Sequence, residues 1–410
     1  MTGGHFFKKT MADVPLTNKN ILLRADYNVP LTDDGQIADD FRIRSSLATV
    51  QALLTDGCTV TIISHLGRPD GKKDLQYTLQ PVAKRLSELL GREVRFIDDC
   101  IGHKVFMATK KAPKGSVTLL ENLRFYPGEE ANDSAFAQQL AKQTHADYFV
   151  QDGFGVVHRA HASTSAITQF LPSVAGLLLE REYSVITKAM KHPEKPLVAV
   201  LGGAKVSDKI PIIKALEHAA DTIIVGGAMA NTFLARRGNF MGSSHIEPDQ
   251  AETIDAIYEA AAQKVGRQNA DNYIVLPTDV GVGTSLELTA TRLDVSVKAI
   301  PAGSYALDIG PDSIARMESI IAKARTVIWN GPLGMDELPT FAQASTRLAQ
   351  LLAGHPDITS IVGGGDTADF VIHWDPHHGE SFSHVSTGGG ASLELMAGEK
   401  LPGVEALLDA

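Results

Sequence analysis

The sequence predicts an α/β protein made of two doubly wound parallel-sheet domains, Rossmann-like in architecture and joined by a hinge helix. The chain has 410 residues, which exceeds the size at which a single hydrophobic core usually keeps growing. Short aliphatic runs alternate with longer amphipathic stretches, a pattern typical of parallel strands covered by helices on both faces. The alternation restarts after Pro196, beyond a helical stretch bounded by prolines. Together these observations predict two domains of the same class.

In the first half of the chain, five short runs rich in β-branched and aliphatic residues predict buried strands. They are Ile21 to Arg24, Thr59 to Ser64, Val94 to Ile97, Val117 to Leu120 and Tyr148 to Gln151. Between them, apolar residues recur at helical spacing, which predicts helices over Arg44 to Thr55, Leu79 to Leu90 and Ser134 to Thr144. These strands and helices predict the first domain, which we place at residues 1–175.

A second set of strands follows a helical connector. Gly176 to Lys191 lies between Pro172 and Pro193, and prolines restrict the residue before them and lack a donor, so this stretch is predicted as one helix. The later strands are predicted at Leu197 to Leu201, Thr222 to Val225, Tyr273 to Leu276, Thr326 to Trp329 and Ser360 to Val362. The expected boundaries are therefore 176–192 for the connector, 193–388 for the second domain and 389–410 for a separate last segment.

Composition excludes several classes of protein. The formal net charge is −10, which argues against general nucleic-acid binding. No apolar run approaches the ~20 residues needed to span a bilayer, and Met1 to Met11 contains no apolar segment of a secretory signal. Cys58 and Cys100 have no metal-like spacing and are expected to be free core cysteines in a reducing compartment. We therefore expect a cytoplasmic protein without membrane or nucleic-acid partners.

Polar side chains follow the predicted strands of the first half. Asp26 and Asn28 come directly after the first strand, where they either orient a hydroxylated ligand or end the strand in an Asx turn. Arginines stand at later strand ends, within the segments Ser64 to Pro69, Glu121 to Phe125 and His158 to His161. Because parallel strands end at one edge of a sheet, these arginines and Arg42 favour a multiply anionic ligand over incidental surface charge.

Glycine clusters mark the second half in the same way. Gly202-Gly203, Gly226-Gly227 and Gly363-Gly364-Gly365 each follow a predicted strand and precede a helix, where backbone amides and helix N-termini can hold phosphate. Lys205 and Lys209 share one helix face and suit a moving phosphoryl group, although a solvated first turn is the ordinary alternative. Asp366 can either cap its helix or hold Mg²⁺. Neither a P-loop nor a GxGxxG dinucleotide motif is present, which disfavours a dehydrogenase.

Taken together, these segments resemble the phosphoglycerate kinase family over essentially the whole chain, from Arg24 to Ala391. The most specific segments are Ser64 to Pro69, Glu121 to Tyr126, His158 to Ser163, Gly202 to Ile210 and Gly363 to Ala368, in the family's order. The resemblance implies reversible phosphoryl transfer between 1,3-bisphosphoglycerate and ADP, with Mg²⁺ accompanying the nucleotide. It also implies a monomer that closes by hinge bending, with residues 389–410 returning to pack on the first domain.

The resemblance also assigns site residues. The phosphoglycerate site of the first domain would comprise Asp26, Asn28, Arg42, His65, Arg68, Arg124, His158 and Arg159. The nucleotide site of the second would comprise Gly203, Ala204, Lys205, Lys209, Gly227, Asn330, Glu337, Gly364, Gly365, Asp366 and Thr367. Within these sets, Arg42, Lys205 and Lys209 are the expected catalytic residues, Asp366 the expected Mg²⁺ contact and Glu337 the expected ribose contact.

The chain departs from the usual family pattern at several positions. The segment before His158 reads Gln151-Asp152-Gly153-Phe154-Gly155-Val156-Val157, without the expected threonine. Ala228 replaces a glycine, Asp336 stands beside the expected ribose contact, and Ala344-Ser345 replaces Gly-Thr. None of these removes a residue expected to carry chemistry, but a catalytically silent binding scaffold of the same fold remains the alternative function.

Overall fold

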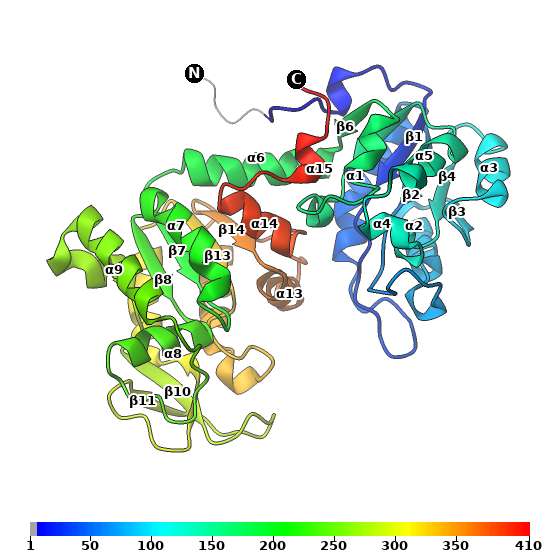
Figure 1. The fold of residues 1–410 in the computed structure, drawn as a ribbon. Helices are drawn as coiled ribbons and strands as arrows, with labels where there is room; N and C mark the ends of the chain where they lie inside the picture. The colour runs from blue at the N-terminus through cyan, green and yellow to red at the C-terminus, as the bar shows by residue number, and fades with distance from the viewer. Residues whose placement is uncertain (1–5) are drawn as a thin grey trace. The chain divides into compact units, whose positions relative to one another are not determined.

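The computed structural model describes residues 6–410, and the chain divides into two compact units (Figure 1). The first unit runs to Ser184 and includes Lys400–Ala410, and the second comprises Val185–Glu399. The first domain was expected to span residues 1–175, and residues 1–5 of that range lie outside the described part of the chain. Two units of mixed α/β structure confirm the predicted fold class.

The first unit is built on a six-stranded sheet in which every neighbouring pair is parallel. Its order is β3-β4-β2-β1-β5-β6. The strands are β1 (Asn20–Arg24), β2 (Thr59–Ile63), β3 (Val94–Ile97), β4 (Val117–Leu120), β5 (Tyr148–Gln151) and β6 (Ser173–Ala175). Successive side chains point to opposite faces, so Leu23 and Ile62 join one core cluster while Leu22 and Ile63 join another. Apolar residues therefore run continuously along these strands, as the sequence predicted.

Helices lie between the strands of the first unit, and a last one, near the end of the chain, follows them. They are α1 (Phe41–Thr55), α2 (Gln80–Leu90), α3 (His103–Lys110), α4 (Pro127–Glu130), α5 (Ser134–Gln143) and α15 (Pro402–Glu405). Short 3₁₀ turns lie at η1 (Met11–Asp13), η2 (Leu75–Tyr77), η3 (Leu123–Phe125), η4 (Phe154–Val156) and η5 (Ala166–Gln169). Local signals fix several ends: Asp133 accepts a hydrogen bond from Phe136 N at 2.6 Å to begin α5, and Gly91 ends α2 in the left-handed conformation.

The second unit repeats the design around a parallel sheet of order β15-β14-β13-β7-β8-β9. Its strands are β7 (Leu197–Leu201), β8 (Thr222–Val225), β9 (Ile274–Val275), β13 (Thr326–Asn330), β14 (Thr359–Gly363) and β15 (His384–Val385). Its helices are α7 (Ile210–Ala219), α8 (Gly227–Arg236), α9 (Ala251–Val265), α10 (Ala270–Tyr273), α11 (Pro311–Ile321), α12 (Gln343–Gly354), α13 (Gly365–Trp374) and α14 (Gly389–Met396). The 3₁₀ turns are η6 (Ser207–Lys209), η7 (Arg267–Asn269) and η8 (Pro339–Phe341).

A separate antiparallel sheet in the second unit was not predicted. It consists of β10 (Asp279–Gly283), β11 (Leu293–Ser296) and β12 (Tyr305–Ile309), in the order β11-β10-β12. Glycines alternate with valines in β10, and because glycine is uncommon inside strands the strand pattern is hidden. Glycine is required at position 281, because Arg292 lies over it and leaves no room for a larger side chain. The predicted strand at Tyr273 to Leu276 is also shorter, because Tyr273 ends α10 and only Ile274–Val275 pair with β8.

Helix α6 (Leu177–Lys191) connects the two units and confirms the helix predicted over Gly176 to Lys191. At its start, the Asp152 carboxylate accepts hydrogen bonds from the backbone N–H groups of Leu178, at 2.9 Å, and Leu179, at 3.4 Å. Gly176 leaves space for that carboxylate, since a Cβ there would lie 2.2 Å from Asp152 Oδ1. The boundary between the units falls within α6, after Ser184, and not at its first residue.

The last segment returns to the first unit over a shorter range than expected. Lys9 N donates to Leu408 O at 2.8 Å and Gly403 N donates to Val157 O at 2.8 Å, which ties residues 400–410 to the first unit. Residues 389–399 belong to the second unit, because α14 packs against α7, α13 and β14. The expected range 389–410 is therefore corrected to 400–410.

Cys58 and Cys100 are buried and free, as predicted. Over residues 6–410, the helices are too short or too polar for any of them to cross a membrane.

Candidate functional site

The first predicted site lies where β1, β2, β4 and β5 end. Arg42, in the first turn of α1, donates to both carboxylate oxygens of Asp26, at 3.2 and 3.1 Å, and to Asn28 O at 3.2 Å. Asp26 is buried, whereas the Arg42 side chain keeps 28 % of its surface exposed. The Asp26 carboxylate therefore holds the Arg42 guanidinium group in one orientation, and the outer face of that group stays accessible to an anion.

The loop after β2 joins this group through backbone atoms. Asn28 Oδ1 accepts a hydrogen bond from Gly67 N at 2.8 Å, and Arg124 Nη1 donates to Gly67 O at 2.8 Å. Arg124 also pairs with Glu130, at 3.1 Å, and is itself buried. The structure thus brings together Asp26, Asn28, Arg42, the His65 loop and Arg124, which the sequence placed at one sheet edge.

Three other predicted residues are more exposed, and of these His158 is only partly so. Arg68 and Arg159 are exposed side chains, and Arg159 Nε lies 3.2 Å from His158 Nε2. Arg159 is close enough to affect the pKa of Arg124. Burial lowers that pKa, the charge of Glu130 raises it, and the positive charge of Arg159 lowers it further. The exposed arginines are free to move toward a ligand.

Histidines in this site are uncharged. Burial lowers the pKa of His65 well below its usual range, and the charges of Arg24, Arg124 and Arg42 lower it further. Burial and the same kind of positive surroundings lower the pKa of His161 to about 4. The positive charge that can attract an anion is therefore carried by guanidinium groups and not by imidazoles.

Sequence reasoning missed a buried ionic group beneath this site. Arg24, with no exposed surface, donates from Nε to Ser163 Oγ at 2.8 Å and lies 3.9 Å from Glu129 Oε1. Ser163 Oγ in turn donates to Glu129 Oε1 at 2.6 Å. The only sequence signal is that a charged residue ends an otherwise apolar strand, followed by Ala25.

The second predicted site lies at the carboxyl ends of β7, β8, β13 and β14. Backbone contacts hold its loops together: Gly203 N donates to Pro332 O and Met229 N to Gly203 O, both at 2.9 Å. Gly227 N donates to Leu333 O at 2.9 Å and adopts a left-handed φ of 63°. A Cβ at Gly227 would lie 2.7 Å from both Gly203 N and Pro332 O, so only glycine fits this junction.

Lys209 and Asn330 meet at the centre of this site. Lys209 is 9 % exposed and donates from Nζ to Asn330 Oδ1. The buried Asn330 amide nitrogen has no hydrogen-bond partner within residues 6–410. Burial lowers the pKa of Lys209, opposed by the nearby charges of Asp208 and Asp366. Two buried polar groups without full compensation indicate a site prepared for a polar ligand.

The remaining predicted residues of this site surround that pair. Thr367 Oγ1 accepts a hydrogen bond from Gly331 N at 2.7 Å, which ties the loop after β14 to the loop after β13. Ala204 and Lys205 are exposed on the loop before η6, Gly365 and Asp366 are exposed in the first turn of α13, and Gly364 is partly exposed. The expectation that Lys205 and Lys209 share one helix face is wrong, because Lys205 precedes η6, Lys209 ends it, and α7 begins only at Ile210. Helix N-termini beside an exposed lysine suit bound phosphate groups.

Asp366 is the one residue expected to contact metal. Within residues 6–410 there is no group of three or more His, Cys, Asp or Glu side chains that could hold a metal ion by itself. Mg²⁺ in nucleotide enzymes commonly takes one or two carboxylates and completes its shell with phosphates and water. A single exposed carboxylate near Lys209 fits a metal that arrives with a nucleotide, and does not fit a permanent protein-only metal centre.

Glu337, the expected ribose contact, is exposed on the loop between β13 and α12. Its neighbour Asp336 has both carboxylate oxygens buried, and burial raises its pKa to about 7. The same loop is anchored by Asp308, which pairs with Arg292 at 2.6 Å and accepts from Gln343 N at 3.0 Å. Ser345, another departure, accepts from Leu333 N at 3.0 Å, so its hydroxyl supports the loop.

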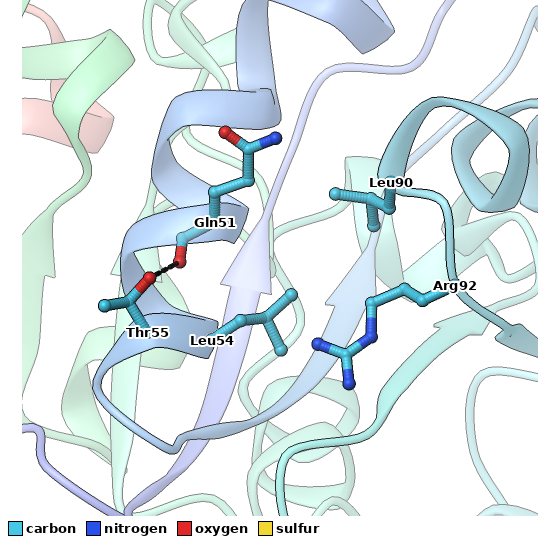
Figure 2. A pocket seen from close by; sticks show the side chains of 5 residues that line it. All are labelled: Gln51, Leu54, Thr55, Leu90 and Arg92. Atoms are coloured by element: carbon cyan, nitrogen blue, oxygen red, sulfur yellow. Dashed lines mark hydrogen bonds between the residues drawn. The ribbon is translucent and has the colours of Figure 1, made fainter.

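A cavity of the first unit lies away from the first site. It has a volume of about 460 Å³ and is lined by Gln51, Leu54, Thr55, Leu90 and Arg92 (Figure 2). These residues stand at the C-terminal ends of α1 and α2, whereas Arg42 stands at the opposite end of α1. The cavity is therefore separate from Arg42 and from the first site.

One sheet edge is lined by guanidinium groups, and the other is built from glycine loops and lysine. These features are typical of an α/β enzyme that binds phosphorylated ligands. The chain matches the model of the family described as "Phosphoglycerate kinase" over residues 11–399. It is 45 % identical over 400 residues to a phosphoglycerate kinase of Desulforudis audaxviator (strain MP104C), covering 98 % of this chain and 99 % of that one.

Further relatives agree. A phosphoglycerate kinase of Trichodesmium erythraeum (strain IMS101) is 47 % identical over 406 residues, covering 98 % of this chain and 99 % of that one. The solved structure of phosphoglycerate kinase from Coxiella burnetii superposes with a TM-score of 0.82 at 36 % identity, covering 97 % of this chain and 98 % of that one. The chain belongs to the phosphoglycerate kinase family.

Proposed function

We propose that this protein catalyses reversible phosphoryl transfer between 1,3-bisphosphoglycerate and ADP, giving 3-phosphoglycerate and ATP, as a step of glycolysis and gluconeogenesis. The observation that carries the proposal is the match to the phosphoglycerate kinase family across residues 11–399. The enzyme is then a phosphotransferase with a carboxyl group as acceptor.

In this proposal the first unit binds the phosphoglycerate. Arg42, Arg124 and the exposed Arg68 and Arg159 supply positive charge, while Asp26 sets the position of Arg42. Asn28, His65 and His158 supply neutral hydrogen-bonding groups. The ligand is a multiply charged anion, and bidentate guanidinium contacts suit its phosphate and carboxylate oxygens.

The second unit binds the nucleotide. The loops at Gly203, Gly227 and Gly364 bring backbone close to the ligand, and Glu337 takes the ribose. Lys205 and Lys209 hold the phosphates, with Asn330 and Thr367 fixing the loops around them. Mg²⁺ held by Asp366 together with the nucleotide phosphates would neutralise charge on those phosphates.

The chemistry needs no proton abstraction by the protein. In the direction of ATP formation, an anionic oxygen of the ADP β-phosphate forms a bond to phosphorus, and the bond from phosphorus to the carboxyl oxygen breaks. The attacking oxygen is already anionic at neutral pH, and the leaving oxygen departs as a carboxylate that needs no proton, so neither a general base nor a general acid is required. Arg42, Lys205 and Lys209 act by aligning the phosphoryl group and stabilising its charge.

Phosphoryl transfer requires the two ligands to meet with water excluded. We therefore propose that the enzyme works by hinge bending about α6. A cytoplasmic monomer with only small-molecule substrates, ADP or ATP and phosphoglycerate, is the form in which we propose it acts.

The test is turnover of 3-phosphoglycerate with Mg-ATP, coupled to glyceraldehyde-3-phosphate dehydrogenase, in the wild type and in Arg42→Ala. We expect strong turnover in the wild type and a kcat lowered about 100-fold in the variant, because a charge-stabilising donor is lost, with ADP affinity unchanged. Arg44→Ala is the matched control, since Arg44 lies on the same helix and pairs with Asp40 at 2.7 Å.

Equal losses of kcat and ADP affinity in Arg42→Ala would contradict the role given to Arg42. No turnover by the wild type, with ADP binding intact, would favour a catalytically silent scaffold. The departures at Val156 and Asp336 would then be the first positions to revert.

A further inference from the structure

Arg24 is a buried arginine that the proposed chemistry does not use. It ends β1, and its guanidinium group donates to Ser163 Oγ at 2.8 Å and to the Ala25 carbonyl oxygen. Glu129, also without exposed surface, lies 3.9 Å away and offsets its charge. Three of its contacts thus hold the guanidinium plane in one orientation.

The remaining contact of Arg24 is with His65. Arg24 Nη2 lies 3.2 Å from His65 Nδ1, and both groups are buried. A guanidinium group has five N–H donors and no acceptor, so the imidazole nitrogen must accept. Nδ1 therefore carries a lone pair and no proton.

The charged alternative for His65 conflicts with the same geometry. Asp26 Oδ1 lies 3.9 Å from His65 Nδ1, which is too far for a hydrogen bond. The Asp26 carboxylate would form an ion pair with His65 only if the imidazole were protonated. If Nδ1 carried a proton, its N–H would face the N–H of Arg24 Nη2 over 3.2 Å. In the imidazolium form, two positively charged groups would also be adjacent. Asp26 is in any case occupied by Arg42.

We infer that Arg24 is a positioning residue that holds His65 as a neutral imidazole with its proton on Nε2. The inference deepens the proposed function, on which its meaning for catalysis rests. Nε2 makes no hydrogen bond within the part of the chain that the structure describes, so its N–H remains available as a donor to an oxygen of the phosphoglycerate. His65 then contributes a directional hydrogen bond to the anion site, and the arginines contribute positive charge.

Every charged or titratable group near His65 agrees with this state. Arg24, Arg42 and Arg124 are cations that oppose protonation of the ring, and His161 is itself neutral. The two nearby carboxylates are already engaged, Asp26 by Arg42 and Glu129 by Ser163. The site therefore attracts an anion without depending on a histidine charge that would vary near neutral pH.

The experiment is a long-range ¹H–¹⁵N correlation spectrum of the ligand-free protein labelled at its histidines. His65 is assigned by the signals missing from a His65→Gln spectrum, and the chain has 14 histidines. We expect the pattern of an unprotonated Nδ1 and a protonated Nε2, unchanged between about pH 6 and 8. A protonated Nδ1, or an imidazolium in that range, would overturn the inference.

Arg24→Lys supplies the second arm, because lysine keeps the charge but loses the planar guanidinium donor. We expect His65 to lose its single tautomer and the KM for 3-phosphoglycerate to rise about tenfold, with the KM for ATP unchanged. A variant that keeps the wild-type His65 spectrum would show that Arg24 does not set the tautomer.

If Arg24→Lys fails to fold, the wild-type spectrum alone still decides the tautomer. Because that spectrum needs no turnover, an inactive protein with the expected pattern would contradict the proposed function and leave the inference standing.

Discussion

Asp152 is a buried carboxyl group placed at the first turn of α6. The residue is 1 % exposed, and Oδ1 accepts the N–H groups of Leu178 and Leu179. Burial raises the pKa of Asp152 to about 7, and hydrogen bonding to Thr49 and to the N–H groups of α6 only partly offsets this. Between about pH 4 and 7, the folded state therefore holds a proton that the unfolded chain has released.

This difference predicts that the free energy of unfolding falls as pH rises from about 4 to 7. Asp152→Asn keeps an acceptor for α6 but cannot ionise, so we expect the variant to lose less stability over this range. The gain of the variant relative to the wild type should grow by roughly 2–4 kcal/mol between pH 4.5 and 8. Urea unfolding of both proteins at several pH values measures it.

Asp308 and Asp336 have raised pKa values in the same range, so the comparison with the wild type, and not the absolute slope, is informative. Asp147→Asn is the control, because the exposed Asp147 carboxylate also accepts a backbone N–H, from Asn20 at 2.8 Å. Parallel pH curves for the wild type and Asp152→Asn would refute the assignment of the protonated state.

At the scale of elements, the proposed nucleotide site depends on two loops whose backbones pack closely against each other. The β7 and β8 loops meet at Gly203 and Gly227, where a single added methyl group would lie 2.7 Å from two backbone atoms. Gly227 is also the first residue of α8, so the junction sets where that helix N-terminus points. Ala228, the departure beside it, lies on the helix and does not enter this junction.

We predict that Gly227→Ala weakens Mg-ADP binding at least tenfold, because the β7 loop must move to make room. The control is Gly238→Ala, which also has positive φ, 85°, but has nothing within 4 Å of the added Cβ. Both variants should lose about 1–2 kcal/mol of stability from the strained backbone alone. Only Gly227→Ala should lose affinity in a calorimetric titration with Mg-ADP. Equal affinities would mean that the junction does not shape the nucleotide site.

The strand positions were predictable because each is a short apolar run between turn residues. Five strands, among them β3, β4 and β7, begin and end where the sequence predicted them. The sheet of β10, β11 and β12 was not, because Gly281 and Gly283 interrupt β10 and β11 is largely exposed. Its role in holding Arg292 against Asp308 depends on contacts that local pattern does not contain.

At the scale of the molecule, the first unit is completed by the end of the chain. Leu401, Val404 and Leu407 are almost fully buried, and Leu408 N donates to Ser173 O at 3.0 Å, beside β6. Burying each of these side chains contributes about 1.5–3 kcal/mol, which is a large part of the stability of an ordinary domain. Residues 400–410 are thus part of the fold of the first unit, although 215 residues of the second unit, Val185–Glu399, intervene.

We predict that a chain ending at residue 399 unfolds its first unit at lower temperature while the second unit is unaffected. Both tryptophans, Trp329 and Trp374, lie in the second unit, so tryptophan fluorescence reports that unit alone. Circular dichroism should show an earlier transition that fluorescence does not follow. Leu408→Ala, which truncates a side chain that is 41 % exposed, should leave both transitions nearly unchanged. A simultaneous fall in both signals would contradict independent units.

The sequence by itself determined the class of fold, five of the six strands in each parallel sheet, the connecting helix and the residue types at both sheet edges. It could do so because strand pattern and strand-end position are local properties, and parallel strands must end at a common edge. Only the tertiary structure decided that Arg24 faces His65, that Asp152 stays buried under α6 and that residues 389–399 stay with the second unit. These outcomes depend on which distant groups share a low-dielectric interior, and that is set by packing between elements far apart in the chain.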